Sequence, residues 1–222
     1  MLRPEPLVDD QVYHVMNKSI AGYKIFNAAA DYQRMIQLIR FFQLDAPLPK
    51  FSQFLHSAYV TRHGFEQTLQ EWHAEQKRHV QIIAYCIMPT HLHLILKPLQ
   101  KNGATFFLSN ILNSYTRYFN TKHNRRGPLW VGRFKNVSVK TDEQLLHLTR
   151  YLHLNPVTAR IVSQPEKWQY SSYREYTIHG EPFPICQYEG LFEIDPAEYQ
   201  KFVKDHIAYQ RELAVIKKLA LE

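Results

Sequence analysis

Cysteine is scarce in this chain of 222 residues, which contains only Cys86 and Cys186, far apart in the sequence. This excludes a disulfide scaffold and a thiolate metal site, and it is typical of a reduced, cytoplasmic protein. No apolar run reaches the roughly 18–20 residues that a membrane-spanning helix needs. The first residues also lack the apolar segment of a secretory signal, so we expect a soluble protein without a membrane partner.

Acidic residues are absent from one long stretch. Residues 76–141 contain no Asp or Glu, although they carry eleven Lys and Arg residues, and the whole chain has a formal net charge of +7. A surface that only confers solubility mixes both signs of charge, whereas an acid-free basic block attracts polyanions. The distribution therefore predicts a nucleic-acid partner.

Hydrophobic periodicity predicts an α+β protein. Strands are expected at residues 11–20, 80–88 and 91–96, and helices at residues 31–44, 51–77, 104–121, 141–155 and 196–219. Asp31 is the expected N-cap of the first helix, and Thr141 that of the helix that ends before Pro156. This order of elements predicts an antiparallel sheet with helices packed mainly on one face.

His91 and His93 stand two residues apart on an expected strand. Alternation places both imidazoles on one face, with Cα atoms about 6.5–7 Å apart, where they could share one metal ion. The alternative is a pair of hydrogen-bonded polar residues at a sheet edge.

A third ligand must come from elsewhere, because no acid is nearby. Tyr151 and Asn155 stand four apart on an expected helix and therefore share a face. Two imidazoles and one amide oxygen suit Mg²⁺ or Mn²⁺ that is completed by a substrate phosphate better than they suit structural zinc. Such an ion would polarise the phosphate.

Five blocks of sequence follow one another in a specific order. They are Met88–Leu94 (MPTHLHL), Tyr115–Asn120 (YTRYFN), Gly127–Lys135 (GPLWVGRFK), Tyr151–Val162 (YLHLNPVTARIV) and Trp168–Tyr173 (WQYSSY). One HxH motif is common by chance, but this series resembles the HUH-type, IS200-like tyrosine transposases. The resemblance is strongest to the branch associated with repetitive extragenic palindromes (REP), and it covers about residues 13–176.

The resemblance implies a ferredoxin-like core and a reaction on single-stranded DNA, often beside a hairpin. It implies that His91, His93 and Asn155 bind the metal. It also implies that Tyr151 is the catalytic nucleophile, which forms a 5′-phosphotyrosine link and leaves a free 3′-hydroxyl. We therefore assign residues 1–180 to a catalytic domain, with a helical insertion at about residues 46–78. Residues 181–222 form a C-terminal helical extension, and the protein is a monomer or a homodimer.

Tyrosine is a weak nucleophile near pH 7, because its ordinary pKa is about 10. A cation must assist Tyr151, either the metal or a base such as Arg150. Tyr115 and Tyr118 are rival nucleophiles, and the alternative for each tyrosine is packing in the core. His147 and His153 flank Tyr151. His147 could tune the site or act in proton transfer, but we expect both to be partly exposed polar residues.

Basic residues around an aromatic loop are the expected DNA contacts. Arg133 and Lys135 flank Phe134, and Trp130 is expected either to stack on bases or to fill the core. Arg125 and Arg126 form a loop tip that could grip a hairpin backbone, and Arg117 could meet the backbone from its helix.

Two other functions remain open. The chain could be a structure-specific DNA-binding protein in which cleavage is vestigial, although a pure binder needs neither Tyr151 nor the two histidines. A zinc hydrolase is a third possibility, which lacks a carboxylate base near His91 and His93. His14, on the first strand, would approach the site if that strand were central.

Overall fold

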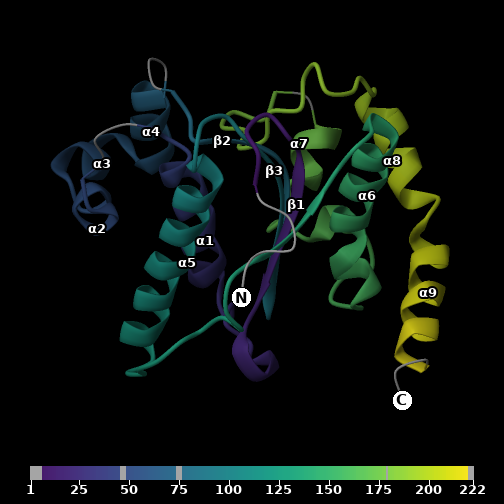
Figure 1. The fold of residues 1–222 in the computed structure, drawn as a ribbon, viewed down its shortest axis with the longest axis horizontal. Coiled ribbons are helices and arrows are strands. Elements are labelled where there is room, and N and C mark those ends of the chain that lie inside the picture. The colour runs from purple at the N-terminus through teal and green to yellow at the C-terminus, as the bar shows by residue number, and fades with distance from the viewer. Residues whose placement is uncertain (1–6, 46–48, 74–76, 179, 220–222) are drawn as a thin grey trace.

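A four-stranded antiparallel sheet lies between two layers of helices in the computed structural model, which describes residues 7–45, 49–73, 77–178 and 180–219 (Figure 1). The strands are β1 (Tyr13–Lys18), β2 (Val80–Met88), β3 (His91–Pro98) and β4 (Lys135–Ser138), in the order β2-β3-β1-β4. The sequence did not predict β4, which has only four residues and no buried side chain. None of the described helices combines the length and the apolar character needed to cross a membrane.

The register of the sheet separates its two faces. Val15 pairs with Leu94, and Met16 pairs with His93. Because successive side chains on a strand alternate, Val15 and Leu94 share one face while His93 lies on the other. β1 is a central strand, because it pairs with β3 on one side and with β4 on the other.

Helices α1 (Ala29–Phe42) and α5 (Gly103–Lys122) pack against each other on one face of the sheet. The chain order β1-α1-β2-β3-α5-β4 with this strand order is the ferredoxin-like arrangement, so the expected α+β class and antiparallel sheet are confirmed. Phe107, Ile111 and Tyr115 recur at helical spacing on α5, and all three are fully buried.

Helix α6 (Asp142–Thr158) covers the opposite face of the sheet, so the helices occupy both faces and not mainly one. The reason lies in the strands themselves. Cys86 and Ile95 are buried on the face that carries His93, and Ile87 and Leu94 are buried on the other face, so β2 and β3 are apolar on both sides. A strand of this kind needs cover on each face.

The start of α6 follows the expectation and its end does not. Thr141 is the N-cap, and its side-chain oxygen accepts a hydrogen bond of 3.1 Å from the backbone N–H of Gln144. The helix nevertheless continues beyond Pro156 to Thr158. Burial of Leu154 and Val157 holds this last turn in place and outweighs the local preference of the residue before a proline.

Asp31 is not the N-cap of α1, since the helix begins one turn earlier, with Ala28 as the cap. The Asp31 carboxylate reaches back to accept hydrogen bonds from the backbone N–H groups of Asn27 and Ala28, each 3.0 Å long. It also accepts from Tyr118 Oη and Lys122 Nζ. This fully buried carboxylate therefore joins α1 to α5.

The region of the expected insertion folds as three short helices and not as one. They are α2 (Phe51–Leu55), α3 (Ala58–His63) and α4 (Phe65–His73). Gly64 separates the last two with a φ of 85°, which side chains rarely allow. Residues 46–48 and 74–76 of the expected insertion, as well as the chain ends 1–6 and 220–222, lie outside the described residues.

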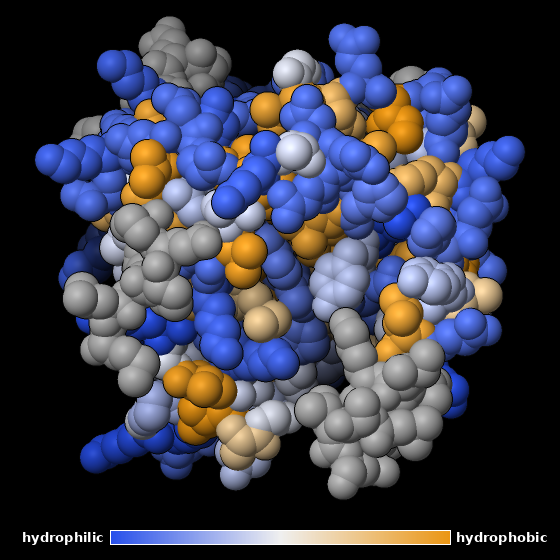
Figure 2. All heavy atoms as spheres, turned by 45° about the vertical axis from the view of Figure 1, so that its right-hand side comes forward, coloured by the Kyte–Doolittle hydropathy of each residue, from blue (hydrophilic) through white to orange (hydrophobic). Residues whose placement is uncertain are grey.

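The expected C-terminal helix is divided into α8 (Pro196–Lys204) and α9 (Ile207–Leu219), which pack on α6 on its side away from the sheet (Figure 1). The remaining short elements are η1 (Ile20–Gly22), η2 (Pro165–Lys167) and α7 (Tyr173–Thr177). Seen from the side that carries α8 and α9, the surface is mainly hydrophilic, and its apolar side chains are scattered in small groups (Figure 2). The extension thus presents a polar outer surface and an inner face against α6.

Candidate functional site

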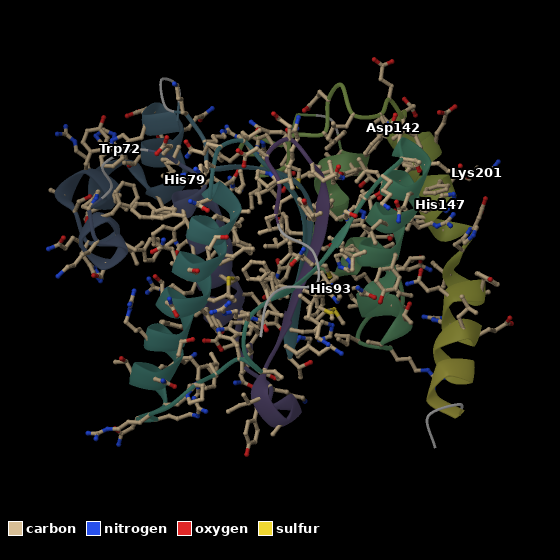
Figure 3. The ribbon with its side chains drawn as sticks, viewed as in Figure 1. Trp72, His79, His93, Asp142, His147 and Lys201 are labelled. Carbon is tan, nitrogen blue, oxygen red and sulfur yellow. The ribbon has the colours of Figure 1, made fainter. Side chains whose placement is uncertain are left out.

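The two histidines of the HxH motif lie on the sheet face that α6 covers. Their ring centroids are 4.9 Å apart, with an angle of 81° between the ring planes. His93 is 3% exposed and His91 is half-buried. In Figure 3, His93 lies at the middle of the sheet, between the strands and α6.

Tyr151 reaches this pair from α6. Its ring meets the His93 ring edge-on, with the centroids 6.3 Å apart. The side chain is 40% exposed, so it is neither sealed in the core nor free in solvent. The structure therefore brings together a phenol and two imidazoles from segments that are more than 50 residues apart.

The direction of α6 determines where Asn155 lies. The early part of α6, at Gln144 and His147, borders a hollow of about 330 Å³ together with His14 and β4. Further along the helix, Tyr151 lies against His93, so α6 runs antiparallel to β3. Asn155, one turn later on the same face, therefore follows in the direction of His91.

Asn155 is 9% exposed, and its Nδ2 has no hydrogen-bond partner among the described residues. A buried amide with an unpaired end is uncommon, because the lost hydration of the polar atom is not replaced. An amide in this state is available to a ligand that enters the site.

His14 is part of the same cluster, because β1 is central. Its Nε2 is 3.0 Å from His93 Nδ1, and the two rings stack with their centroids 5.2 Å apart. This hydrogen bond engages one ring nitrogen of His93 and leaves Nε2 as the nitrogen that can bind a metal.

Lys18 contributes charge that the sequence reasoning missed. It pairs in register with His91, so it lies on the same face as the histidines, and it is exposed. Period-two spacing from His14 through Met16 to Lys18 was the available signal.

The environment keeps the histidines neutral. Burial lowers the pKa of His91 to about 4, with a further contribution from Lys18, and burial lowers the pKa of His14 to about 4. The pKa of His93 lies well below its ordinary value because of burial and then because of the charges of His91, His14 and Lys18. Neutral imidazole is the form that binds metal ions.

The Tyr151 phenol, in contrast, is not activated by the protein alone. Burial raises its pKa above the ordinary value, and Cys86 adds to the shift. Arg150, the expected assisting base, points elsewhere: its guanidinium donates to His147 Nδ1 at 2.7 Å and lies 4.1 Å from the ring centroid of Phe202. The expectation for Arg150 was wrong, because neighbouring residues on a helix point about 100° apart.

Tyr115 and Tyr118, the rival nucleophiles, make hydrogen bonds within the protein fold. Tyr115 is fully buried, and its hydroxyl donates to the carbonyl of Ile25 at 2.6 Å. The Tyr118 hydroxyl donates to Asp31 on the opposite side of the sheet from the histidines. Each side chain joins packed elements, as the alternative of core packing predicted.

His147 and His153 differ from one another. His147 is partly exposed as expected, and it lies between α6 and α8 (Figure 3). Its ring centroid is 5.5 Å from that of Phe202 on α8. His153 is fully buried, which corrects the expectation of a polar surface residue. Its Nδ1 lies 2.6 Å from Tyr199 Oη and its Nε2 lies 2.8 Å from Ser172 Oγ, so both ring nitrogens have partners in the interior.

The buried His153 makes the stability of the protein sensitive to acid. Burial lowers its pKa to about 3, whereas an unfolded histidine has a pKa of about 6.5. Between these values the unfolded state binds more protons, so the free energy of unfolding falls as the pH falls. Replacement by His153→Gln should reduce the loss of stability between pH 7 and pH 5 by about 2 kcal/mol, measured by urea unfolding at both values. An unchanged pH dependence, equal to that of the exposed control His123→Gln, would contradict this assignment.

The expected DNA contacts separate into three groups. Arg126, Arg133 and Lys135 are exposed, and Lys135 pairs with Met16 in the register, on the face that carries His93. Arg117 is exposed on α5, beyond the opposite face of the sheet.

The side chains of Arg125 and Trp130 make hydrogen bonds within the protein. The Arg125 guanidinium donates to Asn120 Oδ1 at 2.8 Å and to the carbonyl of Pro128 at 2.6 Å, so it braces its own loop. Trp130 is 8% exposed, and its Nε1 donates to the carbonyl of Leu112 at 3.2 Å. Its ring is therefore not available for stacking on bases, and the alternative of a core residue describes it.

The donor set fits a weakly held divalent ion. Within the described ranges, no group of three or more His, Cys, Asp and Glu side chains is arranged to hold a metal. The neutral imidazoles of His91 and His93 nevertheless form an incomplete ligand set, to which a phosphate oxygen could add. The unpaired Nδ2 of Asn155 is a hydrogen-bond donor, so it suits a phosphate oxygen and not a metal ion. A closed structural zinc site needs more protein ligands than this.

Comparisons with known proteins agree with the resemblance read from the sequence. The model of the IS200-like transposase family matches residues 56–155. The chain is similar to a protein of Haemophilus influenzae that is described as a REP-associated tyrosine transposase, with 24% identity over 133 residues, which cover 55% of this chain and 72% of the relative. It is also similar to the solved structure of a REP-associated tyrosine transposase bound to a REP hairpin. That match has a TM-score of 0.54 and 14% identity and covers 88% of this chain and 96% of the other, so the likeness extends to the fold.

Proposed function

Because the chain is related in sequence and in fold to the IS200-like, REP-associated tyrosine transposases, we propose that it cuts and rejoins single-stranded DNA beside a hairpin. One observation carries this proposal. The half-exposed phenol of Tyr151 lies against His93, which is itself beside His91, on the one sheet face where a basic strand edge is also exposed.

In the proposed chemistry, one phosphate of the DNA backbone is transferred from its 3′-oxygen to the phenol oxygen of Tyr151. The phenol oxygen of Tyr151 attacks the phosphorus of a phosphodiester, and the bond from phosphorus to the 3′-oxygen breaks. The leaving 3′-oxygen takes up the proton that the phenol loses and becomes a free 3′-hydroxyl, and the strand downstream of the cut stays linked to the tyrosine through its 5′-phosphate. Reversal with a second 3′-hydroxyl joins two strands without ATP, because the bond energy is kept in the covalent link.

A divalent ion, Mg²⁺ or Mn²⁺, is the proposed cofactor. His91, His93 and the amide oxygen of Asn155 would hold it, and when bound it would supply positive charge beside the phosphate and the phenol. The raised pKa of Tyr151 makes such a charge necessary, because Arg150 points away from the phenol. His14 would act as a positioning residue that keeps the His93 ring in one tautomer through its hydrogen bond.

Basic side chains around the site would orient the DNA. Lys18 lies beside the histidines, Lys135 lies on the edge strand of the same face, and Arg133 is exposed just before that strand. Contacts of this kind hold phosphates without reading sequence. The exposed part of the Tyr151 ring leaves room for an extended single strand.

The proposal is tested by incubating the protein with an end-labelled oligonucleotide that carries a hairpin and single-stranded flanks, with Mn²⁺ and without it. We expect cleavage and a covalent protein–DNA product that survives denaturation, and both should disappear with a chelator. Tight binding of the intact hairpin without any cleavage would support the alternative, a DNA-binding protein whose cleavage activity is vestigial.

The hydrogen bond from His14 predicts a measurable effect on metal binding. In His14→Ala, the Nδ1 of His93 loses its partner, and the affinity for Mn²⁺ should fall by roughly 10-fold or more. Isothermal titration with Mn²⁺ measures this without any DNA, and the exposed His56→Ala serves as the matched control. Equal affinities in the two variants would remove His14 from the site.

A further inference from the structure

A second basic surface lies on the opposite side of the sheet from Tyr151. It is a groove of about 1060 Å³, bordered by α1, by α5 and by the residues that lead into α2. Pockets for small ligands measure roughly 300–1,000 Å³, so this groove has room for an extended chain segment. Because α1 and α5 cover the face opposite to α6, the groove is separate from the histidine site.

The groove carries an excess of positive charge. Arg34, Lys50, Arg117 and Lys122 contribute to its lining, and no Asp or Glu is among the described lining residues. Lys122 is paired with the buried Asp31 at 2.6 Å, so its charge is balanced. The other three cations have no such partner among the described residues, and they leave a local potential that favours an anion.

Arg34 is held in position by aromatic rings. Its guanidinium carbon lies 4.8 Å from the ring centroid of Tyr118 and 5.3 Å from that of Phe51. The side chain is half-buried and forms no ion pair with a described residue. A guanidinium that is partly removed from water without an acidic partner gains from an anionic ligand, and its planar donor groups suit phosphate.

Exposed aromatic surface completes the groove. Phe106 of α5 is 44% exposed, although it is a large apolar side chain, and it lines the same groove as Lys50 and Arg117. Aromatic faces beside cations are the combination that binds single strands, because unpaired bases stack on the rings while the cations follow the phosphates. Paired bases of a duplex cannot stack in this way.

We propose that this groove binds single-stranded DNA, independently of the Tyr151 site. The choice of single-stranded DNA as the ligand rests on the proposed function, whereas the place of binding follows from the residues that line the groove. Arg34, Lys50 and Arg117 contact phosphates, and Phe106 stacks on a base. A strand that leaves a hairpin could then be held on one side of the sheet while its cleavage site lies on the other.

The test is the affinity for a labelled oligo(dT), which forms no hairpin, measured by fluorescence anisotropy in EDTA so that no cleavage occurs. The double variant Lys50→Glu/Arg117→Glu should weaken binding at least 10-fold. Its control, Arg62→Glu/Lys201→Glu, changes the net charge equally at exposed sites outside the groove and should weaken binding less than 3-fold. Phe106→Ala should weaken binding roughly 5-fold or more, since one stacked base contributes about 1–3 kcal/mol.

Equal losses in the two double variants would show that only net charge matters, and would overturn the proposal. Unchanged binding by the groove variant would overturn it as well. Hairpin cleavage by the wild-type protein is measured separately. If oligo(dT) binds through the groove while no hairpin is cleaved, the proposal for the groove is supported and the proposed cleavage activity is refuted. The failure of one proposal can therefore be distinguished from the failure of the other.

Discussion

Cleavage of a hairpin-containing oligonucleotide should fall by roughly 1000-fold or more when Tyr151 is replaced by phenylalanine, and the covalent protein–DNA product should disappear. The change removes only the hydroxyl oxygen. The ring that meets His93 edge-on remains, so the packing of α6 on the sheet is kept. Cleavage of end-labelled DNA on denaturing gels measures the rate, and anisotropy in EDTA should show hairpin affinity within about 3-fold of wild type.

The matched control for this variant is Tyr209→Phe. Tyr209 is 58% exposed on α9, so removing its hydroxyl should leave the rate unchanged. Mass spectrometry of the trapped product should locate the DNA on the peptide that contains Tyr151. Attachment to Tyr115 or Tyr118, or full activity of Tyr151→Phe, would refute the assignment of the nucleophile.

The free energy of unfolding should fall by about 3–5 kcal/mol when Tyr199 is replaced by alanine. Tyr199 is fully buried in α8, and its hydroxyl donates to Thr149 Oγ1 at 2.9 Å and lies 2.6 Å from His153 Nδ1. The ring also meets Tyr176 with the centroids 4.8 Å apart. Truncation leaves a cavity and two buried polar groups of α6 without their partner, so the midpoint of urea unfolding should fall strongly.

Tyr209→Ala is the control for this prediction, because it removes an exposed tyrosine from the same extension and should change stability by about 0.5 kcal/mol or less. A small loss in Tyr199→Ala would mean that the extension is only loosely attached. The predicted loss would make α8 an integral support of α6, the helix that carries Tyr151.

Much of the architecture follows from local patterns. The apolar runs at Val80–Met88 and His91–Leu96 and the amphipathic spacing of α5 predicted these elements to within two residues. The Thr141 cap was also predicted, because a capping side chain bonds to a backbone group three residues away. The predictions were wrong where contacts between distant segments determine the structure. β4 was missed because it forms only through its pairing with β1, and α6 extends past Pro156 because its last turn is buried.

The candidate site, too, was predicted in part from local spacing and depends in part on contacts between distant segments. Spacing alone placed His91 and His93 on one face, and it placed Tyr151 and Asn155 on one helix face, since these periods are properties of the backbone. The approach of Tyr151 to His93 and the contact of His14 with His93 depend on which strand is central and on where α6 lies.

The sequence by itself determined the basic character of the chain, the motif residues and most of the helices and strands, because each depends on composition or on residues close along the chain. Only the tertiary structure decided that Trp130 and His153 are buried, that Arg150 turns toward Phe202, and that Arg34 lies between aromatic rings. Burial and contacts between distant segments arise from the packing of whole elements, and no local pattern of residues encodes them.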